Sequence, residues 1–386
     1  MQNGQKKLTQ SYGLNEIALV PTLQTIDPDL VDISTEIAGK KLPVPIFASA
    51  MDSVVSPETA KLIGKLGGLA VLNLEGVQTR YDDAGAILEK IASVSKADYV
   101  ALMQEIYKEP IKAELIKKRI KTIKEGGVLA AVSITPQQAD SLGPIAIDAG
   151  ADFIVIQSTV VSTRFQTSEG KKNLDLKAFC KQASVPVLVG NTTTDEVTYE
   201  LLQTGVKGIF VGIGPGAACT TRGVLGIGVP MATAILDCAA ARNRYFNETG
   251  TYVSIIADGG IVNSGDICKA LACGADAVMI GSPLAKSKEA PGRGFHWGMA
   301  TPNVVLPRGA RIEVGTIGSL NEIFSGPSRT DDGSQNLSGA IQVCLATLGV
   351  ATIRDMHEKV GVTIAPALQT EGKVYQSAQN LGMYKK

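Results

Sequence analysis

The sequence predicts a (β/α)8 barrel, and three observations lead to this fold class. Short apolar runs recur along the 386 residues, stretches of helix length separate most of them, and glycine-rich turns cluster after the later runs. Runs that are apolar throughout, rather than alternating with polar residues, are typical of strands buried in a parallel sheet. Eight strand–helix units in succession therefore favour one barrel domain over residues 1–386.

The expected strands follow one another at regular intervals. They are PVPIFAS (43–49), GGLAVLN (67–73), VLAAVSI (128–134), ADFIVIQ (151–157), PVLVGN (186–191), GIFVGIG (208–214), SIIADGG (254–260) and AVMIGS (277–282). Helical stretches such as TTDEVTYELLQTG and SGDICKALACG lie between them. A doubly wound open sheet is the alternative, but no G-x-G-x-x-G follows the first run, and late glycine-rich turns are typical of phosphate sites in barrels.

Two connections are irregular. Residues 77–125 are charged and helical in pattern, and we expect helices that wrap the barrel with a solvated charged face. Residues 286–320 are rich in glycine and proline, which predicts a mobile flap.

Composition excludes several classes of partner. Lysine plus arginine and aspartate plus glutamate both number 37, so the chain has no electrostatic footprint for nucleic acid or an acidic membrane. The first residues lack the apolar region of a signal peptide and no apolar run has membrane-spanning length, so we expect a cytoplasmic protein. The six cysteines form no C-x-x-C pair and only two histidines occur, so neither a disulfide framework nor a zinc cluster is expected.

One cysteine stands out by its surroundings. Cys219 lies in GIGPGAACTTRG (212–223), a glycine-rich loop after the sixth predicted strand. An exposed thiol beside a helix start and near Arg222 would have a depressed pKa, as a nucleophile requires. The alternative is a small buried filler, which is what we expect of Cys238, Cys268, Cys273 and Cys344.

Other polar residues follow the predicted strands at the same barrel face. Asp258 ends the seventh strand, where a carboxylate can accept hydrogen bonds from ribose hydroxyls, although an Asx turn would also explain it. Glycines follow it and also the eighth strand at Gly281, where they allow a phosphate to approach. Ser49, Met51 and Asp52 follow the first strand and should face the same mouth.

These segments resemble those of a known family. GIGPGAACTTR, IIADGGI, VMIGSPLA followed by EAPG, and ASAMDSV are similar to the signature segments of the inosine-5′-monophosphate (IMP) dehydrogenase and guanosine-5′-monophosphate (GMP) reductase family, in the same order. The resemblance extends from SYGLNEIALVP (11–21) to TEGK (370–373), and it implies a barrel that is usually tetrameric.

The resemblance implies a role for each site residue. Cys219 would attack C2 of the purine, hydride would pass to NAD, and water would hydrolyse the covalent intermediate to xanthosine monophosphate, with Thr221 taking part in proton transfer. Met51 would contact the base, Asn191 would lie near the cysteine, and Asp258 would hold the ribose. The expected phosphate ligands are Ser49, Gly260, Gly281, Ser282 and His296. Potassium would bind Gly214, Gly216 and Cys219, together with Glu371 and Gly372 of a neighbouring subunit in a homotetramer or octamer.

The chain departs from the family at several points. The family's regulatory nucleotide-binding pair, about 120 residues after the second strand, does not fit between Asn73 and Val128, so control by it should be absent. Ala217 replaces a serine near the phosphate, and His296 replaces a tyrosine there. Gln157 replaces an aspartate near the cofactor ribose, and we expect Gln157 and Ser158 to contact the cofactor.

The flap departs most. The Arg-Tyr pair of dehydrogenases is missing, and the segment LPRGARIEVG (306–315) has Arg308 where reductases carry a glutamate. An arginine beside a threonine suits activation of water, so we expect Arg308 or Arg311 to be the base of an NAD-dependent IMP dehydrogenase. A GMP reductase that uses NADPH is the first alternative, and a non-catalytic purine-nucleotide-binding protein is the second.

Overall fold

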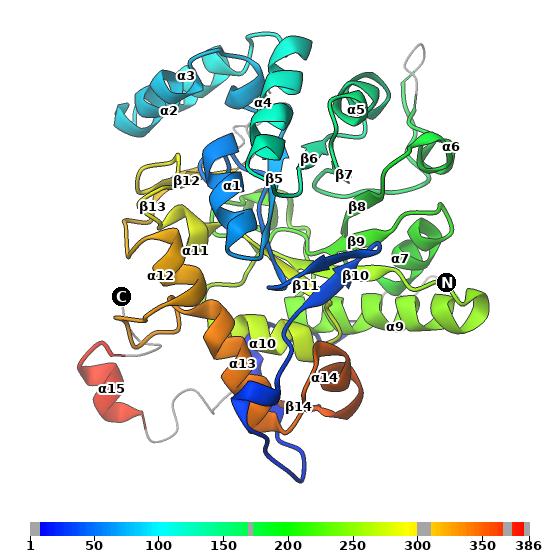
Figure 1. Cartoon of the computed structure of the whole chain (residues 1–386), viewed down its shortest axis with the longest axis vertical. Helices are drawn as coiled ribbons and strands as arrows, with labels where there is room; N and C mark the ends of the chain where they lie inside the picture. The colour runs from blue at the N-terminus through cyan, green and yellow to red at the C-terminus, as the bar shows by residue number, and fades with distance from the viewer. Residues whose placement is uncertain (1–7, 169–172, 299–309, 366–372, 382–386) are drawn as a thin grey trace.

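A computed structural model describes residues 8–168, 173–298, 310–365 and 373–381. Eight parallel strands close into a barrel in the order β10-β11-β4-β5-β6-β7-β8-β9, which confirms the predicted fold class (Figure 1). The strands are β4 (Ile46–Ala48), β5 (Leu69–Asn73), β6 (Ala131–Ile134), β7 (Phe153–Gln157), β8 (Val187–Thr192), β9 (Gly208–Val211), β10 (Ser254–Asp258) and β11 (Ala277–Ile280). Each corresponds to one of the eight predicted runs, and only β8 extends beyond its run, by the one residue Thr192.

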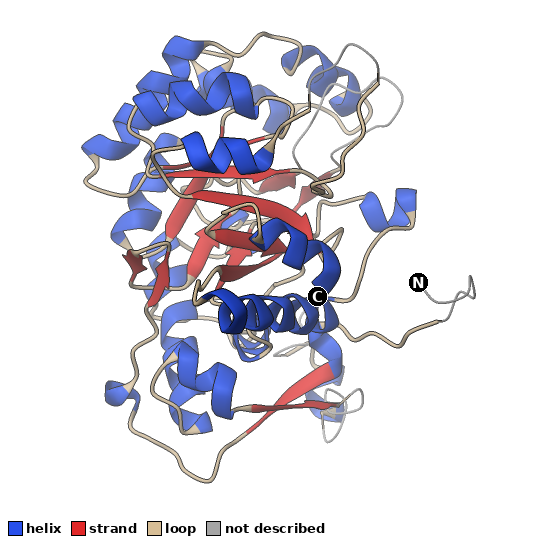
Figure 2. Ribbon diagram, turned by 90° about the vertical axis from the view of Figure 1, so that its right-hand side faces the viewer, coloured by secondary structure: helices blue, strands red, loops and turns tan. Residues whose placement is uncertain are grey.

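Helices surround this barrel, as the secondary-structure colouring shows (Figure 2). Those that connect successive strands are α1 (Pro57–Lys65), α4 (Ala113–Glu125), α5 (Ala139–Asp148), α6 (Leu176–Gln182), α7 (Asp195–Leu202), α9 (Met231–Thr249) and α10 (Ser264–Ala272). After β11 come α11 (Ser282–Ala285), α12 (Leu320–Ser325), α13 (Leu337–Leu348), α14 (Ile353–Lys359) and α15 (Val374–Ala378). No helix in the described ranges is long and apolar enough to cross a bilayer.

The local sequence explains where helices begin and which face they bury. Ser56 caps α1 by accepting a hydrogen bond from the Thr59 amide at 3.2 Å, and Pro57 fits the first helical position. In α4, Leu115, Ile116, Ile120 and Ile123 are buried, while the lysines between them are exposed. The charged run is therefore a solvated helix face, as predicted.

The barrel interior is a packed core with one end closed. Phe47, Phe153 and Phe210 are buried together inside the barrel. The hairpin of β2 (Thr35–Ile37) and β3 (Lys40–Leu42) adds Ile37 and Leu42 to this cluster. Lys40 lies over the Phe153 ring, at the first residue of β7, so the hairpin covers the amino-terminal end of the strands. The opposite end remains for the site.

A second hairpin packs partly against helices outside the barrel. It joins β12 (Phe295–Trp297) to β13 (Arg311–Glu313), within the predicted flap. Trp297 is fully buried among side chains of α2 (Ala84–Ser93) and α3 (Tyr99–Ile106), which form a small separate core. The expectation that all helices of residues 77–125 wrap the barrel is thus wrong for α2 and α3, because their apolar faces pack with Trp297 of β12. Figure 1 shows both helices apart from the barrel strands.

The remaining elements are short. Strand β1 (Ile17–Val20) pairs antiparallel with β14 (Gly361–Ile364), which places these two segments side by side. Helix α8 (Thr221–Leu225) follows the Cys219 loop, and 3-10 turns occur at Leu14–Glu16, Pro28–Leu30 and Val77–Thr79.

Candidate active site

A cavity of about 780 Å³ lies at the carboxyl ends of the barrel strands. Most of the predicted site residues within the described ranges line it: Ser49, Met51, Gln157, Ser158, Asn191, Gly214, Gly216, Cys219, Thr221, Asp258, Gly260, Gly281, Ser282 and His296. Arg308, Glu371 and Gly372 lie outside the described residues. The loops after six strands therefore converge as the sequence predicted.

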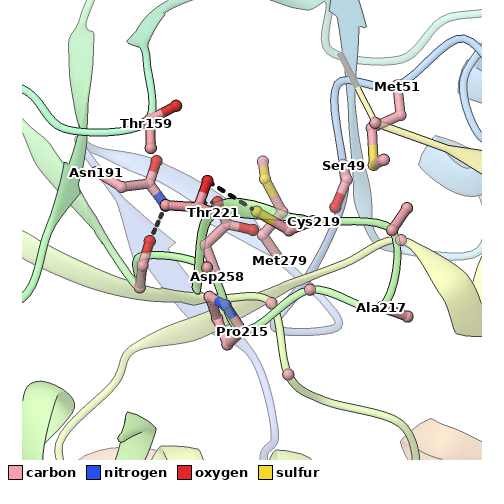
Figure 3. Close-up of a pocket in the computed structure, with 18 of the residues that line it drawn as sticks. Ser49, Met51, Thr159, Asn191, Pro215, Ala217, Cys219, Thr221, Asp258 and Met279 are labelled. Atoms are coloured by element: carbon pink, nitrogen blue, oxygen red, sulfur yellow. Dashed lines mark hydrogen bonds between the residues drawn. The ribbon is translucent and has the colours of Figure 1, made fainter. Parts of the chain in front are cut away.

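Cys219 projects into this cavity from the loop between β9 and α8. It is exposed, and its thiol donates a hydrogen bond to Thr221 Oγ1 at 3.3 Å (Figure 3). Its amide donates to the Gly216 carbonyl at 3.0 Å, which closes a tight turn around the thiol. Ser49 and Met51 approach from the other side (Figure 3). A nucleophile, a hydroxyl partner and open space thus meet at one point.

Four of the other cysteines have a different chemistry. Cys238, Cys268 and Cys273 are buried, and burial raises the pKa of the Cys238 and Cys273 thiols to about 12. Half-buried Cys180 has a pKa raised to about 11 for the same reason. Because the thiolate is the nucleophile, these thiols are poorly reactive.

Glycine is required where the Cys219 loop meets the next loop. Gly212 has φ +142, and a Cβ there would lie 2.2 Å from the Asp258 carbonyl oxygen. Gly260 has φ +71, and its Cβ would lie 2.9 Å from the Pro215 side chain. These glycines bring the cysteine and Asp258 to the same cavity.

Arg222 has a structural task that the sequence did not reveal. Its guanidinium donates to the carbonyls of Ile213, at 3.2 Å, and Val229, at 2.8 Å. These two hydrogen bonds tie together the start and the end of the loop that carries Cys219. Arg222 therefore holds this loop in place.

Asp258 is held by two amides. Its Oδ2 accepts from Asn191 Nδ2 at 2.7 Å and from Gln157 Nε2 at 2.8 Å. Burial raises the pKa of Asp258 to about 6, while the two amide donors act in the opposite direction. The carboxylate is ionised at neutral pH and fixed in direction.

His296 is buried at the other side of the cavity. Its Nδ1 lies 3.0 Å from Ser53 Oγ, and burial lowers the pKa of the imidazole to about 4. A Cβ on Gly281 would lie 3.3 Å from His296 Nε2 and 3.3 Å from Met51 Sδ, so a larger residue there would require these side chains to shift. The histidine is neutral at neutral pH and serves as a hydrogen-bonding group rather than a cation.

Comparison with known proteins decides the family. The family model described as IMP dehydrogenase / GMP reductase domain matches residues 11–301. An uncharacterized oxidoreductase of Mycobacterium tuberculosis H37Rv is 40% identical over 364 residues, covering 92% of this chain and 96% of that protein. The chain belongs to the IMP dehydrogenase/GMP reductase family.

Two further relatives of this family are informative. The IMP dehydrogenase of Cryptosporidium parvum is 28% identical, with 92% of each chain covered. The crystal structure of an IMP dehydrogenase/GMP reductase-like protein from Corynebacterium glutamicum has a TM-score of 0.86 and 35% identity, covering 94% of this chain and 96% of that one. Membership of this family makes the protein an oxidoreductase.

The flap of this family member corrects one prediction. Arg311 donates to the carbonyls of Ile91 and Ala92, and also to that of Val94 at 2.7 Å. Its guanidinium also lies over the Phe295 ring at 4.5 Å. Arg311 does not line the cavity, so it is an anchor of the flap hairpin and not the base for hydrolysis.

Asp52 is a second correction. It is buried, and its Oδ2 accepts hydrogen bonds from the Tyr107 hydroxyl and, at 3.0 Å, from the Val77 amide. It does not line the cavity. Its carboxylate instead ties the loop that carries Met51 to the end of α3.

Apolar residues that the sequence did not single out also line the cavity. Apolar side chains with partial exposure line it: Val160, Val224, Leu225, Ile227 and Val262. Thr135 and Gln137, after β6, lie there too. Val224 and Leu225, shortly after Thr221, could have indicated these apolar residues, because a helix that follows the nucleophile must present some side chains to the same cavity.

Proposed function

We propose that this family member oxidises IMP to xanthosine monophosphate with NAD, through a covalent intermediate on Cys219. The observation that carries the proposal is the exposed Cys219 thiol beside Thr221, in a cavity that also presents the Asp258 carboxylate. Simple nucleotide binding needs no nucleophile, so this arrangement favours an enzyme over the non-catalytic alternative. Relatives named IMP dehydrogenases favour oxidation of IMP over reduction of GMP.

The chemical step begins at the sulfur. The Cys219 thiolate forms a bond to purine C2, and the hydrogen on C2 leaves with its electron pair. NAD, when bound, accepts that hydride. A thioimidate remains between Cys219 and C2; water adds to C2, and the sulfur leaves as thiolate, which gives the C2 carbonyl of the product. Thr221 Oγ1, 3.3 Å from the sulfur, is placed to relay a proton during these steps.

Binding of the nucleotide uses both sides of the cavity. The Asp258 carboxylate accepts hydrogen bonds from ribose hydroxyls, and Met51 contacts the base. Amide, hydroxyl and imidazole donors stabilise the negative charge of the phosphate. They belong to Ser49, Gly260, Gly281, Ser282 and neutral His296. Asn191 holds Asp258 and, through Gly212, the start of the cysteine loop, with Nδ2 at 2.7 Å from the Gly212 carbonyl.

The site also fits the two expected cofactors. The cavity volume of about 780 Å³ leaves room beside a nucleotide, and the apolar side chains of Val160, Val224 and Ile227 suit the flat nicotinamide. Potassium takes oxygen ligands, and the carbonyls of Gly214, Gly216 and Cys219 lie in one tight loop. Glu371 and Gly372 of a neighbouring subunit would complete that site in a homotetramer or octamer.

The test compares two reactions in parallel. Purified protein with potassium is mixed with IMP and NAD, or with GMP and NADPH, and absorbance of the reduced cofactor is followed. We expect NADH to form only with IMP, and to be lost in Cys219→Ala while Cys180→Ala retains it. Consumption of NADPH with GMP would establish the reductase instead, and tight IMP binding with no reaction in either mixture would establish a binding protein.

A further inference from the structure

Gln157 has a position that its expected role does not explain. The ends of β7, β8 and β10 bring Gln157, Asn191 and Asp258 together, although they are far apart in the sequence. Gln157 Nε2 lies 2.9 Å from Asn191 Oδ1 and 2.8 Å from Asp258 Oδ2. Gln157 is only 8% exposed and Asn191 only 6%. The three side chains form a closed triangle at the edge of the cavity.

The amide hydrogens in this triangle are fully used. A glutamine amide has two N–H groups, and those of Gln157 go to Asn191 Oδ1 and Asp258 Oδ2. Those of Asn191 go to Asp258 Oδ2 and the Gly212 carbonyl. Rotating the Gln157 amide by half a turn would place its oxygen against two acceptor oxygens. Gln157 therefore has no hydrogen to donate to a cofactor.

The triangle also fixes which oxygen of Asp258 meets a ligand. Oδ2 accepts both amide hydrogen bonds, so Oδ1 is the oxygen left for a hydroxyl donor. A carboxylate at position 157 would bring a second negative oxygen to the 2.8 Å contact, where like charges share a proton. A neutral donor at 157 leaves Asp258 as a single charge with one free oxygen.

We propose that Gln157 is a positioning residue for Asp258, and through it for the nucleotide ribose, rather than a ligand of the cofactor. The inference rests on the proposed function, since it takes the ligand of Asp258 to be the ribose of IMP. Cofactor recognition then falls to the apolar residues of the cavity, such as Val160, Val224 and Ile227.

Two substitutions test this role, with a matched control. Gln157→Ala removes one donor, and Gln157→Glu keeps the shape but adds a charge; Gln182→Glu makes the same exchange at an exposed position of α6. The dissociation constant of IMP is measured by calorimetry in a Cys219→Ala background, and the KM for NAD in the active enzyme. Melting temperatures establish that each variant folds.

The expected results separate the two ligands. Gln157→Ala should weaken IMP binding about tenfold, the effect of losing one hydrogen bond to a charged group. Gln157→Glu should weaken it more than about tenfold near pH 8, and the loss should shrink towards pH 6 as the paired carboxylates take up a proton. The KM for NAD should change less than about twofold in both, and Gln182→Glu should match the wild type.

Two outcomes would overturn the inference. One is a large rise in the KM for NAD with unchanged IMP affinity, which would make Gln157 a cofactor ligand. The other is no change in either quantity. If the parent protein fails to bind IMP, the proposed function is wrong, and a carboxyl NMR titration still tests the positioning role: Gln157→Ala must raise the pKa of Asp258, because it removes a donor to the ionised form.

Discussion

At the scale of single residues, the site combines a reactive thiol with polar groups whose protonation is set by burial. His296 stays neutral because burial lowers its pKa to about 4. In Asp258, burial raises the pKa to about 6 and so disfavours the ionised form. The ionised form is nevertheless the better acceptor for a ribose hydroxyl. Ionisation of Asp258 therefore favours nucleotide binding but lowers the stability of the free protein.

Asp258→Asn tests this opposition. The folded pKa of Asp258 is above its unfolded value, so ionisation destabilises the folded state as pH rises through about 4 to 6. The variant should be more stable than the wild type near pH 8, by about 2 kcal/mol, and the difference should disappear near pH 4. Its amide oxygen can still accept from Gln157 and Asn191, but it loses the second acceptor, so IMP binding should weaken at least about tenfold.

Denaturant unfolding at several pH values and calorimetry with IMP measure both effects. A variant less stable than the wild type near pH 8, or one with normal IMP affinity, would show that Asp258 does not play this part.

The residue scale also shows where sequence analysis stops. Residue types and their place after strands were enough to locate Cys219, Asp258 and Ser49 at one cavity, because parallel strands bring their carboxyl ends together. The partners of Gln157 and Arg222 could not be predicted. Gln157 contacts residues at the ends of two other strands, and Arg222 contacts backbone carbonyls at the ends of its own loop. Both sets of contacts depend on loop geometry that local patterns do not encode.

At the scale of elements, the flap hairpin and the pair α2–α3 form one unit. Trp297 lies in the core of α2 and α3, and Arg311 crosses to the carbonyls at the end of α2. The residue before Trp297 in the hairpin, His296, lines the cavity. The helices thus set the position of a binding residue through the hairpin.

Arg311→Ala should loosen this unit. It removes three hydrogen bonds to backbone carbonyls and the stacking on Tyr99 and Phe295, so we expect a loss of about 2–3 kcal/mol of stability. Hydrogen exchange at β12 should speed up, and the KM for IMP should rise as His296 loses its support.

Arg293→Ala is the matched control, because Arg293 joins the same region to Glu89 of α2 through an exposed ion pair at 2.9 Å. Such pairs contribute about 0–1 kcal/mol. Equal effects of the two substitutions would refute a specific anchoring role for Arg311.

The strands were predictable and this unit was not, for a physical reason. A strand buried on both faces is apolar throughout, so each of the eight runs carried its own signal. The helical pattern of residues 84–106 showed an apolar face but not its partner, and the hairpin that covers it lies about 200 residues further along the chain. The short strands β2 and β3 carried no clear signal either.

At the scale of the whole molecule, the two ends of the barrel divide stability from function. The β2–β3 hairpin covers the amino-terminal end, and the site residues that line the cavity lie at the carboxyl end. Ile37→Ala should therefore cost about 2–4 kcal/mol of stability and leave the KM for IMP within about twofold.

Leu23→Ala, at a fully exposed position, should change stability by less than about 0.5 kcal/mol. Denaturant unfolding and steady-state kinetics on both variants check this. A strong effect of Ile37→Ala on the KM for IMP would show that the two ends are coupled.

The proposed mechanism depends on a covalent bond between Cys219 and the nucleotide. The most direct measurement is mass spectrometry of protein quenched with acid during turnover of IMP and NAD, followed by peptide mapping. We expect an adduct of the oxidised nucleotide on the peptide that contains Cys219, and none in Cys219→Ala. Turnover without any adduct on Cys219, or an adduct on another cysteine, would contradict it.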